Sequence, residues 1–233
     1  ITACSATPGT TPESTPPLSA TSSPSPNPPQ ISVTATSTSS GLAGQKILYT
    51  DTNHDLWIWD EILGSRQITT SSDIQNAIFS PSGDQIIFTR QQDQSYSLWS
   101  ITPAGTNERE WITAQQFNGM PSRNIKPAFA QIMPLDFQWV NQTPVLIFTT
   151  AYISPANEPI YNYDLWKLDT STGQLQAAIQ AGSGGRPVLS KDGSRAALVR
   201  PDSISTIKMD GSSYLSNVLT FQTINTYTKR EYF

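Results

Sequence analysis

Short apolar runs alternate with polar turns along most of the chain, beginning near residue 44. In the clearest stretch four runs follow one another at residues 77–80, 85–90, 98–102 and 110–113, and two of the turns between them contain Gly83 or Gly105. Short apolar runs bounded by Gly, Pro, Asn or Asp are typical of strands, and glycine is favoured where a turn needs a positive φ. This stretch therefore predicts a four-stranded antiparallel meander.

One tripeptide marks the repetition of this unit: Asp55-Leu56-Trp57, Ser97-Leu98-Trp99 and Asp164-Leu165-Trp166 each follow an apolar run. The first unit lacks an obvious inner strand, and residues 107–117 are the only stretch whose type is ambiguous. The remaining strands are expected at residues 46–50, 56–60 and 66–70, then 136–140, 145–150, 165–169 and 174–179, then 187–190, 195–200, 205–209 and 215–221. A repeated unit of short strands predicts a repeat architecture.

Two segments resemble the repeat of TolB-like β-propellers. Residues 79–88, Phe-Ser-Pro-Ser-Gly-Asp-Gln-Ile-Ile-Phe, are similar to the W-S-P-D-G-x-x-I-x-F core of that family, and residues 189–198 are a looser copy. The Leu-Trp strand matches the third strand of the family's repeat. The third unit departs from the pattern, because Asn141-Gln142-Thr143-Pro144 lacks the glycine of the turn.

The resemblance covers roughly residues 44–221 and implies an all-β fold, a β-propeller of four-stranded antiparallel blades. About four blades are visible, so we expect an incomplete propeller. A β-sandwich is the alternative, and the recurrence of Leu-Trp argues against it. The alignment predicts positive φ at Gly83 and Gly193, and packing between blades rather than sugar stacking for Trp57, Trp99 and Trp166.

The N-terminal part has a different composition. Between residues 5 and 40, Ser, Thr and Pro make up 26 of 36 residues, and Glu13 is the only charged one. Such a segment buries too little apolar surface to offset the entropy lost on ordering. We therefore expect residues 5–43 to be a disordered stalk, followed by an incomplete propeller domain over residues 44–233.

Cys4 is the only cysteine of the chain. The first four residues, Ile-Thr-Ala-Cys, resemble the end of a bacterial lipobox, in which the cysteine is lipidated after the signal peptide is removed. This resemblance implies a lipid anchor at Cys4 and a place on the extracytoplasmic face of a bacterial cell envelope, in the periplasm or at the cell surface. Coincidence is the alternative, because four residues form a short pattern.

Composition and motifs indicate neither a nucleic-acid partner nor a catalytic, metal or cofactor site. Net charge is −4 and the 14 Lys and Arg residues do not cluster. The spacing of Asp51, Asn53 and Asp55 resembles the start of a calcium loop, but Leu56 stands where the loop glycine belongs. The single histidine, His54, is expected at a hairpin tip, and no Gly-x-Ser-x-Gly nucleophile elbow occurs.

Two long loops are the candidates for ligand binding. In a meander, alternate connections lie at the same end, so residues 114–135 and 151–163 should emerge on one face. Aromatic residues and arginine are enriched in binding surfaces. The proposed contacts are Phe117, Arg123, Lys126, Tyr152, Tyr161 and Tyr163. Alternatively, the loops pack on each other and only cover a blade edge.

The resemblance implies a non-enzymatic binding module for a protein or peptide, which we expect to be monomeric. One alternative is the propeller of a prolyl-oligopeptidase-like peptidase whose hydrolase domain lies outside this chain. Another is a carbohydrate-active protein whose catalytic part is elsewhere. Fold does not imply function, so the choice between them depends on the site.

Overall fold

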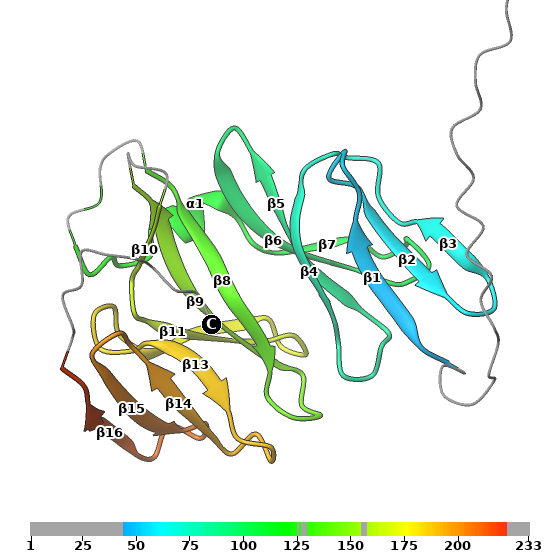
Figure 1. The fold of residues 1–233 in the computed structure, drawn as a ribbon. Coiled ribbons are helices and arrows are strands. Elements are labelled where there is room, and N and C mark those ends of the chain that lie inside the picture. The colour runs from blue at the N-terminus through cyan, green and yellow to red at the C-terminus, as the bar shows by residue number, and fades with distance from the viewer. Residues whose placement is uncertain (1–43, 125, 127–129, 155–157, 223–233) are drawn as a thin grey trace, which may run out of the picture. The chain divides into compact units, whose positions relative to one another are not determined.

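The computed structural model describes residues 44–124, 126, 130–154 and 158–222. The predicted stalk, Cys4 and the C-terminal residues 223–233 lie outside these ranges. The segment Gly41–Phe233 forms one compact unit, and its described part is built almost entirely of strands (Figure 1).

Four sheets follow one another along the chain, and we number them blades 1 to 4. Blade 1 contains β1 (Lys46–Thr50), β2 (Leu56–Asp60) and β3 (Gly64–Gln67). Blade 2 contains β4 (Ile74–Phe79), β5 (Ile86–Gln92), β6 (Ser95–Ile101) and β7 (Arg109–Ile112). Blade 3 contains β8 (Ile132–Trp139), β9 (Val145–Ile153), β10 (Pro159–Tyr161), β11 (Leu165–Asp169) and β12 (Gln174–Ile179). Blade 4 contains β13 (Arg186–Leu189), β14 (Arg195–Val199), β15 (Ser203–Lys208) and β16 (Tyr214–Thr220).

The predicted meanders are confirmed. Neighbouring strands pair antiparallel in every sheet, and blade 1 has no described strand before β1, in line with the missing inner strand in the sequence. The ambiguous stretch resolves into β7 and a short helix, α1 (Ala114–Asn118). A capping box starts the helix: the Thr113 hydroxyl accepts from the Gln116 amide at 3.2 Å, and the Gln116 side chain accepts from the Thr113 amide at 2.8 Å.

The turn between the first two strands confirms the alignment of blades 2 and 4. Gly83 has φ +72° and Gly193 has φ +67°, as predicted. Blade 3 closes a turn of the same length without glycine, because Asn141 adopts φ +52° instead. Asparagine tolerates this left-handed region better than most residues, so the loss of the glycine leaves the turn intact.

Blade 3 is longer than its sequence pattern predicted. β8 begins at Ile132 rather than near Asp136, and β9 runs to Ile153, where it pairs with the additional strand β10. A register shift between Leu135 and Gln138, with Asp136 at φ +54°, divides β8 into two parts. A bulge of this kind interrupts the alternation of apolar residues, which hid the first half of the strand.

The repeated Leu-Trp pair forms the contacts between blades. Leu98 and Leu165 are fully buried in clusters shared with the following blade, whereas Trp99 and Trp166 pack against the cluster shared with the preceding one. This arrangement confirms the packing role of Trp99 and Trp166. Trp57 instead stacks on Tyr49, with ring centroids 6.3 Å apart, on the face of blade 1 away from blade 2.

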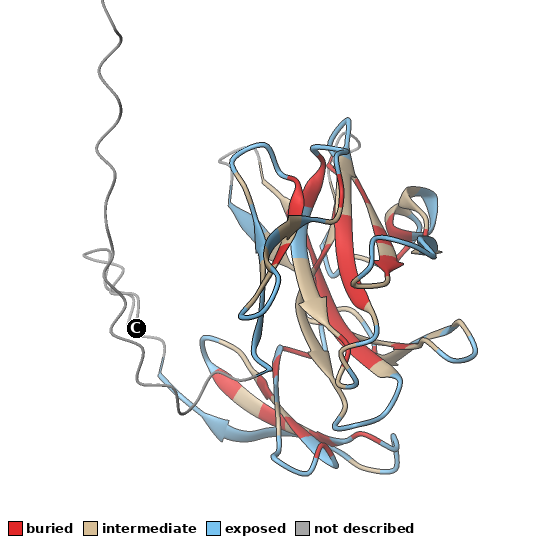
Figure 2. Ribbon diagram, turned by 90° about the vertical axis from the view of Figure 1, so that its right-hand side faces the viewer, coloured by how far each residue is buried: buried red, intermediate tan, exposed pale blue. Residues whose placement is uncertain are grey.

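Exposed apolar side chains gather at the two ends of the row of blades. Among the described residues, the exposed large hydrophobic side chains all belong to blade 1, blade 4 or the residue after β16: Ile47, Tyr49, Ile62, Leu63, Val188, Tyr214, Leu215, Val218, Leu219 and Phe221. Figure 2 shows the contrast between the buried centres of the inner strands and β16, which is exposed along its whole length.

Candidate ligand-binding site between blades 3 and 4

The two loops proposed for ligand binding meet. The Ser122 hydroxyl donates to Asn162 Oδ1 at 2.8 Å, which joins the connection before β8 to the residues after β10. One step further along each segment, the Arg123 guanidinium carbon lies 4.5 Å from the centre of the Tyr163 ring. The loops therefore emerge on one face, as the meander rule predicts, and they also pack on each other.

Two tyrosines and three arginines form a layer at this point, which we call the Arg–Tyr layer: Arg123, Tyr161, Tyr163, Arg186 and Arg200. The rings of Tyr161 and Tyr163 stack, with centroids 6.2 Å apart and planes 9° from parallel. Arg200 lies 4.9 Å from the Tyr163 ring and Arg186 lies 5.7 Å from the Tyr161 ring. Guanidinium groups at such distances from a ring face are attracted by its quadrupole.

Close backbone contacts fix Tyr163 in place. The residue adopts φ +50°, a strained conformation for an aromatic residue. The Gly184 amide donates to the Tyr163 carbonyl, and Arg200 donates to the carbonyls of Gly182 and Gly184. A Cβ on Gly184 would lie 2.7 Å from the Tyr163 carbonyl oxygen, so glycine is needed there. The glycines at 182, 184 and 185 thus serve backbone packing ahead of β13.

A buried polar network supports the layer from below. The Asp164 carboxylate accepts from the Thr150 amide at 2.8 Å, the Thr150 hydroxyl at 2.6 Å and the Trp166 indole at 2.8 Å. The Asn162 side-chain amide donates to the Thr150 hydroxyl at 2.7 Å. Burial raises the pKa of Asp164 even though these hydrogen bonds favour its charged form. The first residue of the Asp-Leu-Trp motif is therefore a structural anchor beneath the site.

The outer end of the layer is held by an ion pair. Arg186 Nη2 lies 3.0 Å from Asp136 Oδ1, and the Thr149 hydroxyl donates to Asp136 Oδ2 at 2.9 Å. The hydrogen bond to Asp136 raises the pKa of Arg186. Burial, followed by the nearby charge of Asp136, raises the pKa of Tyr161. The Tyr161 hydroxyl therefore keeps its proton at neutral pH and can donate a hydrogen bond.

Two of the proposed contact residues are corrected by the structure. Phe117 is fully buried on α1, where its ring meets Phe148 edge-on at 6.0 Å, so it belongs to the core. Tyr152 is only 6% exposed because β9 is paired at this point with β8 on one side and β10 on the other. Aromatic composition alone could not distinguish these inward-facing side chains from surface ones.

The other four proposed residues lie where a ligand could reach them. Arg123 is exposed, and Tyr161 and Tyr163 are half-buried in the Arg–Tyr layer. Lys126 is half-buried, and its ammonium donates to the Ala130 carbonyl. The sequence reasoning missed Arg186 and Arg200. The repeat pattern does contain a signal for Arg200. Arg200 follows Ser190 in blade 4 at the same spacing at which Arg90 follows the aligned Ser80 in blade 2.

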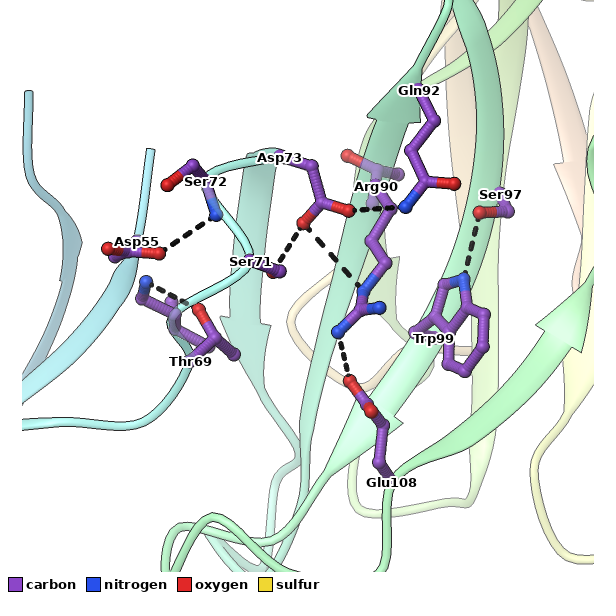
Figure 3. A network of polar contacts seen from close by, with 12 residues as sticks. Asp55, Thr69, Ser71, Ser72, Asp73, Arg90, Gln92, Ser97, Trp99 and Glu108 are labelled. Atoms are coloured by element: carbon purple, nitrogen blue, oxygen red, sulfur yellow. Dashed lines mark hydrogen bonds and ion pairs between the residues drawn. The ribbon is translucent and has the colours of Figure 1, made fainter. Parts of the chain in front are cut away.

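The equivalent arginine of blade 2 lies between two carboxylates (Figure 3). Arg90 lies 4.8 Å from the Trp99 ring, forms an ion pair with Glu108, and points toward Asp73 with a separation of 3.8 Å. Asp73 also accepts from Ser71 and from Gln92, and Asp55 accepts from the Ser72 amide at 2.9 Å. This junction between blades 1 and 2 satisfies its charges internally, unlike the layer between blades 3 and 4.

The described ranges contain neither a candidate metal site nor a candidate membrane-spanning helix. No group of three or more His, Cys, Asp or Glu side chains there could hold a metal ion. The carboxylate of Asp51 accepts from the amides of Asn53 and Asp55 and from the Trp57 indole. No helix in that part of the chain is long and apolar enough to cross a membrane.

Comparison with solved structures identifies the fold. TolB from Acinetobacter baumannii superposes with a TM-score of 0.50 at 17% identity, over 78% of this chain and 43% of that chain. Oligogalacturonate lyase in complex with manganese gives 0.49 at 14% identity, over 71% and 42%. The β-propeller domain of the Trilobed protease from Pyrococcus furiosus gives 0.43 at 12% identity, over 73% and 53%. No protein-family model and no curated protein matches the sequence.

The likeness to TolB, together with the four antiparallel meanders, shows a TolB-like β-propeller fold. At this level of identity the likeness concerns the fold alone. The chain spans less than half the length of the TolB and oligogalacturonate lyase chains it matches.

Proposed function

We propose that this protein is a non-enzymatic binding module, and that the Arg–Tyr layer is its surface for a protein or peptide ligand. The observation that carries the proposal is the convergence of three arginines, from three separate segments of the chain, on two stacked tyrosines. Tyrosine and arginine offer large contact areas and directed donors, and they are enriched where interfaces gain most of their free energy.

Backbone strain supports a role beyond packing. Tyr163 and Asp136 both have positive φ, and both touch the layer, Asp136 through Arg186. Such strained residues tend to occur where a binding surface needs side chains in fixed positions. The layer is also held from beneath by the hydrogen bonds of Asp164 and Asn162, so its rings are pre-organised for a partner.

Selection from a random peptide library tests the proposal. Peptides displayed on phage are selected on the immobilised protein, and the selected peptides are measured again with Tyr161→Ala. We expect loss of binding, because the variant removes one of the stacked rings. Tyr49→Ala is the matched control, since Tyr49 also belongs to a stacked, partly exposed aromatic pair but lies on blade 1. Selected peptides that bind Tyr161→Ala as well as wild type would contradict the proposal.

We further propose an extracytoplasmic location with a lipid anchor at Cys4. The support is the resemblance of the first four residues to a lipobox and the Ser/Thr/Pro-rich segment that follows. Two acyl chains give stable attachment to a bilayer, where a single chain would be marginal.

Fractionation of cells tests the anchor. The precursor is expressed with its signal sequence, either as wild type or as Cys4→Ser. The variant should move from the membrane fraction to the soluble fraction, because it has no thiol to acylate. Ser5→Ala serves as a control for a change at a neighbouring position. Equal membrane association of wild type and Cys4→Ser would rule out this anchor.

A further inference from the structure

The Arg–Tyr layer carries an excess of positive charge on a protein whose net charge is −4. Among the described residues, only one of its three guanidinium groups forms an ion pair, that of Arg186 with Asp136. The junction of blades 1 and 2 has the opposite balance, since Arg90 meets both Asp73 and Glu108. A positively charged surface on a protein of negative net charge favours a negatively charged partner.

The three arginines of the layer differ in which of their N–H donors remain free for a ligand. Arg186 uses Nε and Nη2 on Asp136, and Arg200 uses Nε and Nη2 on the carbonyls of Gly184 and Gly182. Arg123 is exposed, and its contact in the layer is with the face of the Tyr163 ring, which uses none of its N–H donors. Arg123 therefore presents an open guanidinium fork beside the Tyr163 ring.

We infer that the ligand of this layer is an acidic peptide segment, whose side-chain carboxylate pairs with the Arg123 guanidinium while the chain lies across Tyr161 and Tyr163. This inference rests on the proposed function and specifies its ligand. A planar guanidinium fork matches a carboxylate with two parallel hydrogen bonds. The Tyr161 hydroxyl is a neutral donor of the same layer, and the stacked rings supply apolar contact area for the peptide backbone and methylene groups.

A single free fork favours a carboxylate over a phosphorylated residue. Phosphate groups carry close to two negative charges, and proteins recognise them with clusters of arginines. Here the second and third guanidinium groups are already engaged by Asp136 and by backbone carbonyls. Within the part of the chain that the structure describes, the layer thus offers one guanidinium, that of Arg123, with all of its N–H donors open, which corresponds to one carboxylate.

Fluorescence anisotropy with synthetic peptides tests the inference. The probes are a labelled peptide of alternating Glu and Ser, the same peptide with Gln for Glu, and one with a phosphoserine in place of a central Glu. Wild type should bind the Glu peptide most tightly, and added salt should weaken that binding. Arg123→Gln should weaken it by about tenfold, the scale of a charge-assisted hydrogen bond.

Two further variants separate the role of the fork from that of charge and folding. Arg109→Gln is the matched control, because the Arg109 guanidinium lies 3.7 Å from the Trp111 ring in blade 2, away from the tyrosine pair. It should bind the Glu peptide like wild type. Arg123→Lys keeps the charge without the fork and should lie between wild type and Arg123→Gln. Thermal unfolding of each variant shows whether the fold is unchanged.

The outcomes distinguish this inference from the proposed function. Equal affinity for the Glu and Gln peptides, preference for the phosphoserine peptide, or full affinity in Arg123→Gln would overturn the acidic ligand. If library peptides without acidic residues bind and require Tyr161, the binding module stands and its ligand is not acidic. If neither the library nor the Glu peptide gives binding that depends on Tyr161, both proposals are wrong.

Discussion

At the scale of single residues, the turn between the first two strands of a blade is closed in two ways. In blades 2 and 4 the amide of Gly83 or Gly193 donates to the carbonyl of Ser80 or Ser190, at 2.9 and 2.8 Å. In blade 3 Thr143 takes this place, with a donor–acceptor distance of 3.1 Å, and the positive φ moves to Asn141. The hydrogen bond that closes the turn is therefore kept while the residue with positive φ changes.

Substitution of the two turn glycines by alanine should separate backbone strain from steric overlap. Gly83→Ala should lower the free energy of unfolding by about 1–2 kcal/mol, because φ is positive but no other atom lies within 4 Å of the new Cβ. Gly193→Ala should cost more, because its Cβ would lie 2.8 Å from Asn141 Cβ. Urea unfolding monitored by tryptophan fluorescence measures both. Equal losses would show that Asn141 moves aside freely.

A carboxylate in the blade 4 turn predicts a dependence of stability on pH. Hydrogen bonds from the Ser190 and Ser194 hydroxyls lower the pKa of Asp192 to about 2. Because the folded state binds a proton less readily than the unfolded state, the stabilisation is present above the ordinary pKa of 3.8 and is lost as pH falls toward 2. The stability difference between wild type and Asp192→Asn should therefore shrink between pH 4 and pH 2. A constant difference in urea midpoints over this window would contradict the assignment.

At the scale of secondary-structure elements, the sequence pattern predicted strands well where apolar residues alternate without interruption. β5, β6 and β14 lie close to their predicted positions for this reason. The pattern failed for β8, because the bulge at Asp136 breaks the alternation, and for β10, because Pro159 reads as part of a loop. It also failed for the site, since Arg186 and Asp136 come together only through the pairing of different blades.

The junction of blades 1 and 2 should depend strongly on one carboxylate. Asp73 is 7% exposed and accepts from Ser71 and Gln92 beside the Arg90 guanidinium. Asp73→Ala should lower the free energy of unfolding by about 2–4 kcal/mol, because it leaves these donors without their acceptor. Glu108→Ala is the control: Glu108 also pairs with Arg90 but is 36% exposed, so its loss should cost about 1 kcal/mol or less.

Chemical denaturation of both variants gives the comparison directly. The ordering of the two losses matters more than their size, because each includes relaxation of the surrounding side chains. If Glu108→Ala is the more destabilising of the two, the exposed ion pair, and not the buried carboxylate, holds the junction together.

At the scale of the whole described unit, the blades form a row whose inner junctions are buried and whose end blades expose apolar side chains. On β16, Leu215 and Leu219 pair with Thr206 and Ile204, which alternate along β15 with the buried Ser205 and Ile207. The two leucines therefore lie on the face of blade 4 that points away from blade 3. They are 57% and 55% exposed, and apolar surface of this kind favours association.

The exposed leucine face of blade 4 should therefore promote concentration-dependent self-association, in contrast to the monomer expected from the sequence. Leu215→Lys/Leu219→Lys should reduce the concentration-dependent increase in light scattering, because it replaces apolar contact area with like charges on the same face. The free energy of unfolding should change by no more than about 0.5 kcal/mol, since both side chains are exposed. Ser212→Lys/Ser216→Lys adds the same charge to exposed positions of the same blade without removing a leucine. If this control reduces scattering as much as the leucine variant does, net charge and not the apolar face governs association. Wild-type scattering that does not rise with concentration would refute the prediction.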